Sequence, residues 1–208
     1  MGLDLSICLA AAMLALALKP WRAVSTGGPP WPWLAWWAGM PALWAADRIA
    51  SIPIVQPLSG VPLLVLLAGW PLTILALLPV AGVTMVAGGL EAAQALHRLA
   101  WLGVVPATLA LALGTALRRW LPHHLFIYIL GRGFFATMLA MAVAGAVSLA
   151  LHGAPAGSDP DDILIGRWLA ASGEAFLTGM FTAIFVAFRP QWLATYSDRL
   201  YLGPAGPR

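Results

Sequence analysis

Residues 57–89 read PLSGVPLLVLLAGWPLTILALLPVAGVTMVAGG, an apolar run that contains no Asp, Glu, Lys, Arg or His. As one continuous helix this run would be about 50 Å long, whereas the hydrocarbon core of a bilayer is about 30 Å thick. The run therefore has to break or turn back. Gly69-Trp70-Pro71 lies at its centre, and glycine and proline both end helices readily. We predict two short membrane spans, at 57–70 and 71–89.

The whole chain has the composition of a membrane protein. Of its 208 residues, 61% are hydrophobic and 9% are charged, and the mean hydropathy is +0.86. A soluble domain is typically about 45–50% apolar and about 25% charged. Soluble enzymes, nucleic-acid-binding proteins and disordered proteins are therefore excluded, and membrane lipid is the expected partner. The single cysteine, Cys8, excludes an internal disulfide and a cysteine-based metal cage.

Five further apolar segments are candidate membrane spans, because a membrane helix needs roughly 20 mainly apolar residues. They lie at 3–18, 31–46, 99–117, 124–151 and 166–188. We therefore predict an all-α integral membrane protein of about seven transmembrane helices. The spans leave room only for loops, so residues 1–208 are expected to form a single membrane-embedded, permease-like domain.

The basic residues set the predicted orientation, because cytoplasmic loops of membrane proteins are enriched in Lys and Arg. We predict an N-terminus outside and a cytoplasmic C-terminus. The basic residues that this topology places in the cytoplasm are Lys19, Arg22, Arg118, Arg119, Arg189, Arg199 and Arg208. Those left outside are Arg48, Arg98 and Arg167. An acidic loop at 159–162 is also placed outside.

Two ionisable side chains lie well inside predicted spans, Arg132 in 124–151 and Glu174 in 166–188. A charge at the centre of a membrane helix costs about 2.5–3.5 kcal/mol, so both should face protein or a wet cavity. We predict that they form a structural ion pair between the last two spans. Two alternatives stay open. Both side chains could line the polar cavity of a transporter, or Glu174 could be neutral and hydrogen-bonded near the outer boundary.

No catalytic or cofactor motif accompanies these charges. His97 shares a helix face with Gln94 in a segment that we interpret as a solvated amphipathic turn. His152 follows Ser148 by four residues, but a lone Ser–His pair without oxyanion donors is weak support for a hydrolase. Walker, dinucleotide-binding, metalloprotease and Gly-x-Ser-x-Gly motifs are absent from the sequence. We predict no enzymatic activity, no catalytic residues and no intrinsic cofactor.

Stretches in the last two predicted spans and in the residues that follow them resemble a bacterial membrane-protein family. They are HLFIYI at 124–129, GFF at 133–135, GEAFLTGM at 173–180, FRPQWL at 188–193 and DRLYL at 198–202. These stretches resemble the energy-coupling-factor permeases, the substrate-capturing membrane subunits of cobalt and nickel uptake transporters. The likeness is best over 121–202 and weaker over 57–120, and the first 50 residues add little to it.

The resemblance implies a seven-helix permease in the bacterial inner membrane, with its N-terminus outside, that captures a nickel or cobalt ion. It also implies a transmembrane scaffold subunit and cytoplasmic ATPases as partners. Metal-binding members open with Met-His and have a further histidine near the third span. This chain opens Met1-Gly2-Leu3-Asp4 and has Gln56-Pro57 at the second place, so both family histidines are absent. Asp4 and Gln56 are the remaining metal-ligand candidates at these two places.

Two functions therefore follow from the sequence. The first is a permease subunit of an energy-coupling-factor-type ABC transporter for cobalt, nickel or a related small solute. The alternative is a non-transporting membrane accessory protein that keeps the permease fold and has lost the metal site. The missing histidines favour the accessory protein, and the intramembrane charges favour the transporter.

Overall fold

The computed structural model describes residues 1–24, 29–51, 54–155, 157–197 and 201, and this part of the chain is helical without a β-strand. The α-helices are α1 (Gly2–Ala17), α2 (Trp31–Trp44), α3 (Ala46–Ile49), α4 (Val61–Ala68), α5 (Trp70–Ala87), α6 (Ala92–Arg98), α7 (Val105–Trp120), α8 (Ala136–His152) and α9 (Pro160–Phe188). Two π-helical stretches, η2 (Leu99–Val104) and η3 (Ile127–Phe135), join α6 to α7 and lead into α8. Two 3₁₀ turns are η1 (Pro20–Ala23) and η4 (Pro190–Trp192).

Within the described residues, four helical segments are long and apolar enough to cross a membrane. They are Trp70–Ala87, Ala92–Trp120, Ile127–His152 and Pro160–Phe188. This confirms that the described residues are all-helical and include helices long and apolar enough to span a membrane. The number of seven spans and the sides on which the termini lie stay predictions.

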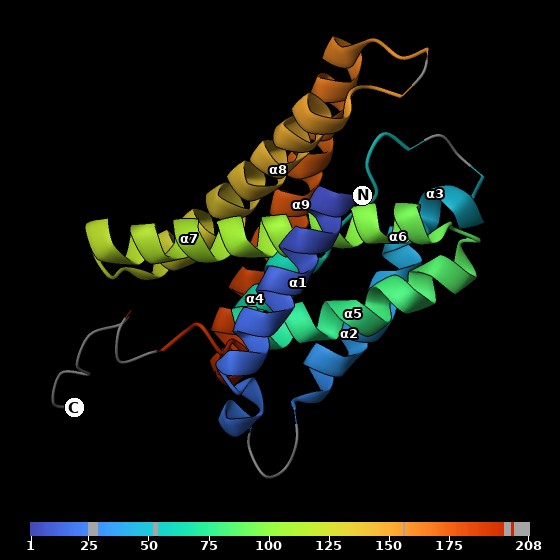
Figure 1. Ribbon diagram of the computed structural model, residues 1–208. Coiled ribbons are helices and arrows are strands. Elements are labelled where there is room, and N and C mark those ends of the chain that lie inside the picture. Colours follow the sequence, from blue (N-terminus) through green and yellow to red (C-terminus); the bar gives the residue numbers. More distant parts are fainter. Residues whose placement is uncertain (25–28, 52–53, 156, 198–200, 202–208) are drawn as a thin grey trace, which may run out of the picture.

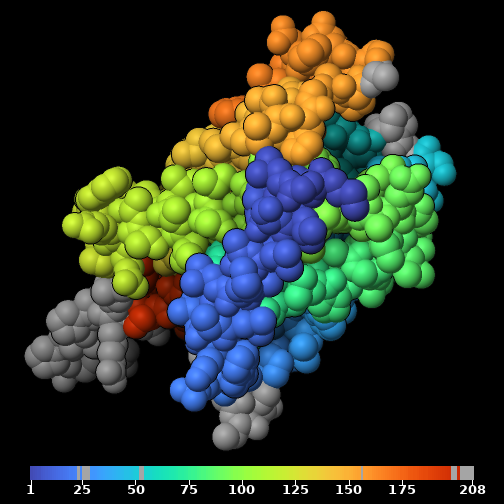
Figure 2. Space-filling view, viewed as in Figure 1, coloured from blue at the N-terminus to red at the C-terminus, as the bar shows by residue number. Residues whose placement is uncertain are grey.

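The helices do not form a simple parallel bundle. α8 and α9 run side by side, α7 extends away from them, and α2 and α5 pack together on the other side (Figure 1). α1 lies across the front of the molecule (Figure 2), where it packs mainly on α5 and η2. The largest buried core lies between α1, α2, α5 and η2, and its members include Met40, Trp44, Leu77 and Ala100.

The predicted break in residues 57–89 is confirmed at Gly69. This glycine has φ +80° and separates α4 from α5, which begins with Trp70-Pro71. The predicted helical span at 57–70 is wrong in its extent. α4 begins only at Val61, so its 8 residues are about 12 Å long, too short to cross about 30 Å of hydrocarbon.

α4 is a half-helix that begins inside the protein. The residues before it are non-helical, and Gly60 has φ +71°, a conformation that glycine adopts at little cost. A Cβ atom on Gly60 would also lie 3.3 Å from the indole nitrogen of Trp36. Non-helical backbone at membrane depth is tolerated where protein covers it. Here Trp44 and Trp36 donate to the carbonyls of Ser59 and Gly60, each over 2.7 Å.

Glu174 of α9 closes the buried start of α4. Its Oε2 accepts a hydrogen bond from the Ser59 backbone N–H over 2.8 Å, and Oε1 accepts from the Gly60 N–H over 2.6 Å. The Ser59 hydroxyl donates in turn to the Leu102 carbonyl of η2 over 2.6 Å. Each oxygen of the Glu174 side chain accepts from one backbone amide, and both amides would otherwise be unpaired in an apolar interior. The Glu174 side chain therefore satisfies the two backbone amides that precede α4.

The predicted ion pair between Arg132 and Glu174 is wrong. The carboxylate of Glu174 is engaged by backbone amides, and the Arg132 guanidinium lies 5.7 Å from the centre of the Tyr128 ring. Arg132 Nη1 also donates to the Thr195 carbonyl over 3.5 Å. A Cβ on Gly114 would lie 2.7 Å from Arg132 Nε, so that glycine leaves the space that the guanidinium occupies.

Two further boundaries differ from the sequence prediction. α9 begins at Pro160, so Asp161 and Asp162 form its first turn, and the Asp159 side chain accepts from the Asp161 N–H at its start. The predicted external loop is therefore largely helical. The predicted span at 99–117 also begins earlier, because α6, η2 and α7 run without interruption from Ala92 to Trp120.

We predict that Glu174→Gln lowers the free energy of unfolding by about 2 kcal/mol, because the glutamine NH₂ would face one of the two amide donors and leave it unpaired. Denaturant unfolding in detergent micelles measures this loss. Asp162→Asn, in the exposed first turn of the same helix, is the matched control and should leave stability unchanged. Equal losses in the two variants would contradict the role assigned to Glu174.

We also predict that the losses caused by Glu174→Gln and Arg132→Gln add in the double variant, because the two side chains have separate partners. The same unfolding measurement gives the coupling energy. A coupling energy of more than about 0.5 kcal/mol would show that the two side chains interact, and would contradict their separate roles.

Candidate metal centre

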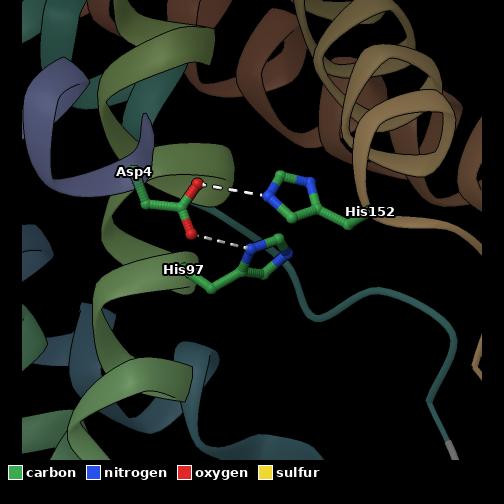
Figure 3. Close-up of side chains that lie close together, drawn as sticks. All are labelled: Asp4, His97 and His152. Atoms are coloured by element: carbon green, nitrogen blue, oxygen red, sulfur yellow. Dashed lines mark hydrogen bonds and ion pairs between the residues drawn. The ribbon is translucent and has the colours of Figure 1, made fainter. Parts of the chain in front are cut away.

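Three ligand-type side chains from three different helices lie close together (Figure 3). Asp4 comes from the first turn of α1, His97 from the last turn of α6, and His152 from the end of α8. Asp4 Oδ2 lies 3.4 Å from His97 Nδ1, and Asp4 Oδ1 lies 3.3 Å from His152 Nε2. One ligand atom of each residue lies within 4.8 Å of those of the other two.

Local structure holds each of these residues in place. α6 starts with a capping box in which Glu91 and Gln94 each accept from the other's backbone N–H. The π-helical stretch η2 follows directly after Arg98 and sets Trp101 facing α1. Trp101 Nε1 donates to Asp4 Oδ1 over 3.0 Å, so the carboxylate that meets the histidines is itself oriented by an indole.

Ring packing and hydrogen bonds orient the two imidazoles. The His97 and His152 rings lie edge to face with centroids 4.7 Å apart, and Trp101 packs against His152 at 5.5 Å. His152 Nδ1 lies 3.1 Å from the Ser148 carbonyl, an acceptor, so Nδ1 is the nitrogen that carries the proton. The lone pair of neutral His152 Nε2 then faces Asp4. Two acceptors this close require a proton or a metal cation between them.

The distances fit one transition-metal ion. Zinc binds imidazole nitrogen at about 2.0–2.1 Å and carboxylate oxygen at about 2.0–2.2 Å, which puts two ligands of one tetrahedral ion about 3.4 Å apart. Asp4 Oδ2 lies at this spacing from His97, and Asp4 Oδ1 lies at this spacing from His152. When each residue supplies one ligand atom, the three atoms lie within 4.8 Å of one another, so small side-chain shifts would bring them onto one ion. His97 Nε2 lies 3.4 Å from the Ser148 hydroxyl, which can accept its N–H when Nδ1 binds the ion.

The Asp4 carboxylate is buried, and the two imidazoles are partly exposed at the surface of the protein. The Asp4 side chain is 4% exposed, whereas those of His97 and His152 are 36% and 29% exposed. A cavity of about 630 Å³, lined in part by Met1, Asp4, Gln94 and His97, adjoins the cluster. An ion can therefore reach the imidazoles from this cavity while the carboxylate supplies negative charge beneath them.

Arg98, the residue after His97, forms an ion pair with Asp47 and not with the cluster. Arg98 donates from Nη1 and Nη2 to the two oxygens of Asp47 on α3, over 2.8 Å and 2.6 Å, and also to the Trp44 carbonyl. The Arg98 guanidinium holds the pKa of the Asp47 carboxyl group below its usual value through this hydrogen bonding. Arg98 is thus tied to α3 and leaves the Asp4 carboxylate to the histidines.

The sequence prediction identified one of the three residues. Asp4 belongs to the cluster, and Gln56 lines the neighbouring cavity on which His97 also lies. The interpretation of His97 as part of a solvated turn is wrong, because it is half-buried in the continuous helix 92–120. The Ser148–His152 dyad is also not formed, since the Ser148 hydroxyl contacts His97 and only its carbonyl contacts His152.

The predicted topology contained one indication that His97 and His152 could lie near Asp4. The predicted orientation places the start of the first span, the segment before 99–117 and the end of 124–151 on the same side of the membrane. Asp4, His97 and His152 lie at these three places. Their separations in the sequence match no ligand motif, so only the packing of the helices brings them together.

Comparisons of the chain with protein-family models, with curated proteins and with solved structures give no significant match. The resemblance to energy-coupling-factor permeases therefore rests on the quoted sequence stretches alone. The metal centre rests on the geometry of its three residues.

We predict that Asp47→Asn lowers the free energy of unfolding by about 1–2 kcal/mol at pH 7. A carboxyl group with a lowered pKa in the folded protein stabilises it above the unfolded pKa of about 3.9 and loses this effect as the pH falls further. The difference between variant and wild type should therefore shrink from pH 7 to pH 3 in thermal unfolding experiments. A difference independent of pH would mean that Asp47 stabilises the fold without its charge.

Proposed function

We propose that this protein binds a divalent transition-metal ion at Asp4, His97 and His152 and serves as the substrate-capturing permease subunit of a metal transporter. The observation that carries the proposal is the convergence of one carboxylate and two imidazoles from α1, α6 and α8 (Figure 3). No two of these residues are close in the sequence, so their meeting is a property of the fold.

The ligand set indicates the class of ion. Imidazole suits nickel, cobalt, zinc and copper, whereas magnesium and calcium prefer sites built from oxygen ligands. Asp4 and two neutral histidines supply three ligands and one negative charge, and leave coordination positions for water or another ligand. Such an incomplete shell suits an ion that is taken up and released. Cobalt and nickel are the ions that the sequence resemblance favours.

The half-helix α4 supports transport rather than simple anchoring. Many transporters place a helix that begins within the membrane beside their substrate path, with its start held by polar groups. In this chain Ser59 and Gly60 precede such a helix, and the Ser59 hydroxyl bonds to Leu102 on η2, five residues after His97. The start of α4 and the metal centre are therefore connected through one continuous helical segment.

The partners and the location belong to the same proposal. A chain without a Walker motif needs a partner that hydrolyses ATP if it moves ions against a gradient. The resemblance to energy-coupling-factor permeases indicates a transmembrane scaffold subunit, cytoplasmic ATPases and the bacterial inner membrane. The alternative is an accessory protein without transport, which the missing Met-His opening favours.

Cobalt binding tests the proposal directly. Purified protein in detergent, titrated with Co²⁺ and followed by visible absorption, should bind one ion per chain. Asp4→Asn, His97→Ala and His152→Ala should each weaken binding by at least tenfold, and His124→Ala, at an exposed histidine outside the cluster, should not. Binding should also weaken as the pH is lowered, because protons compete with the ion for the imidazoles. Equal losses in all four variants, or no binding by the wild type, would overturn the metal site.

Uptake separates the transporter from the accessory protein. Cells that express the chain with an energy-coupling ATPase system should accumulate cobalt or nickel, and His97→Ala should abolish the increase. Cobalt binding by the purified protein without any uptake in cells would overturn transport and support the accessory function.

A further inference from the structure

A second cavity lies next to the metal centre and shares one of its ligands. It has a volume of about 170 Å³, and its polar lining includes Gln56, His97, Ser148 and Arg167. His97 thus faces both this cavity and the larger one beside Asp4. A molecule bound here would lie within reach of the ring that contributes to the metal site.

Arg167 brings an unneutralised positive charge to this cavity. One Nη donates to the Gly145 carbonyl of α8, and its Nε is buried without a hydrogen-bond partner. Across the described ranges, no carboxylate lies within ion-pair distance of Arg167. Arg98, on the wall of the same cavity, is by contrast paired with Asp47 through two hydrogen bonds. Arg167 therefore places a guanidinium without a carboxylate partner on the wall of this cavity.

Two glycines give the cavity its fixed shape. A Cβ on Gly145 would lie 3.2 Å from Arg167 Cδ and 3.2 Å from Gln56 Oε1, so glycine lets both side chains approach α8. A Cβ on Gly166 would lie 3.0 Å from Val55 Cγ1, so α9 packs directly on the segment that carries Gln56. The guanidinium and the amide are therefore held against the same wall.

The charge balance of the metal centre adds a second reason for a ligand. A divalent ion bound by Asp4 and two neutral histidines carries a net charge of about +1, and Arg167 contributes another positive charge close by. Two positive centres in a partly buried pocket repel each other strongly, because protein screens charge less than water does. A single small anion between them removes this repulsion.

We propose that the 170 Å³ cavity binds a small carboxylate through Arg167, beside the metal ion. The planar guanidinium fork matches a carboxylate better than it matches a spherical anion. Typical pockets for larger ligands measure about 300–1,000 Å³, so the volume here fits a carboxylate of a few heavy atoms, such as acetate. The role beside the metal rests on the proposed function, whereas the anion site itself does not.

Binding of acetate to the metal-free protein tests the anion site alone. Saturation-transfer NMR should detect contact between protein protons and the acetate methyl group in the wild type. Arg167→Gln should abolish the signal, Arg167→Lys should weaken it, and Arg118→Gln, at an exposed arginine, should leave it unchanged. The lysine variant keeps the test decisive if the glutamine variant does not fold. A signal of full size in both Arg167 variants, or none in the wild type, would overturn the proposal.

A cobalt titration then tests the coupling of anion and metal. Acetate at 50 mM, compared with perchlorate at the same ionic strength, should tighten Co²⁺ binding about five- to tenfold in the wild type. Arg167→Gln should keep Co²⁺ binding in perchlorate and lose the acetate effect. An acetate effect of the same size in this variant overturns the coupling. Acetate binding without any cobalt binding upholds the anion site and overturns the proposed function.

Discussion

The two hydrogen bonds from Ser59 and Gly60 to the Glu174 carboxylate are the constraint on which the interior depends. They allow a helix to begin inside an apolar environment, where unpaired amides would cost about 1–3 kcal/mol each. They also join α9 to the non-helical segment that carries Gln56, and the Ser59 hydroxyl extends the connection to Leu102. The same contacts thus position the wall of the small cavity and the helix that carries His97.

Some charged side chains of this protein have all their hydrogen-bond partners within the protein, and others do not. Each oxygen of Glu174 has a backbone partner, and both ends of the Arg98–Asp47 pair are satisfied. These groups stabilise the fold. The carboxylate of Asp4 faces two imidazoles that are partly exposed, and Arg167, on the wall of the small cavity, has no carboxylate within ion-pair distance among the described residues. These two groups have capacity left for a ligand.

The sequence predicted the features that depend on local chemistry and missed those that depend on distant partners. Composition and apolar runs identified the long helices, and Gly69-Trp70-Pro71 located the break between α4 and α5. The late start of α4 escaped prediction because it depends on Glu174, more than 100 residues away. The ion pair was predicted wrongly because a sequence shows which charges are buried, but not that backbone amides can satisfy them.

The candidate metal centre also depends on residues that are distant in the sequence, and was therefore hard to predict. Asp4 drew attention because it lies near the chain start, where the resembled family has a ligand, but His97 and His152 follow no ligand spacing. Three helix ends supply one residue each, so no pair of ligands shares an element that would keep them together. A cation at this place would cross-link α1, α6 and α8. Binding of such a cation would therefore depend on how these three helices pack, and the packing would in turn be stabilised by the bound ion.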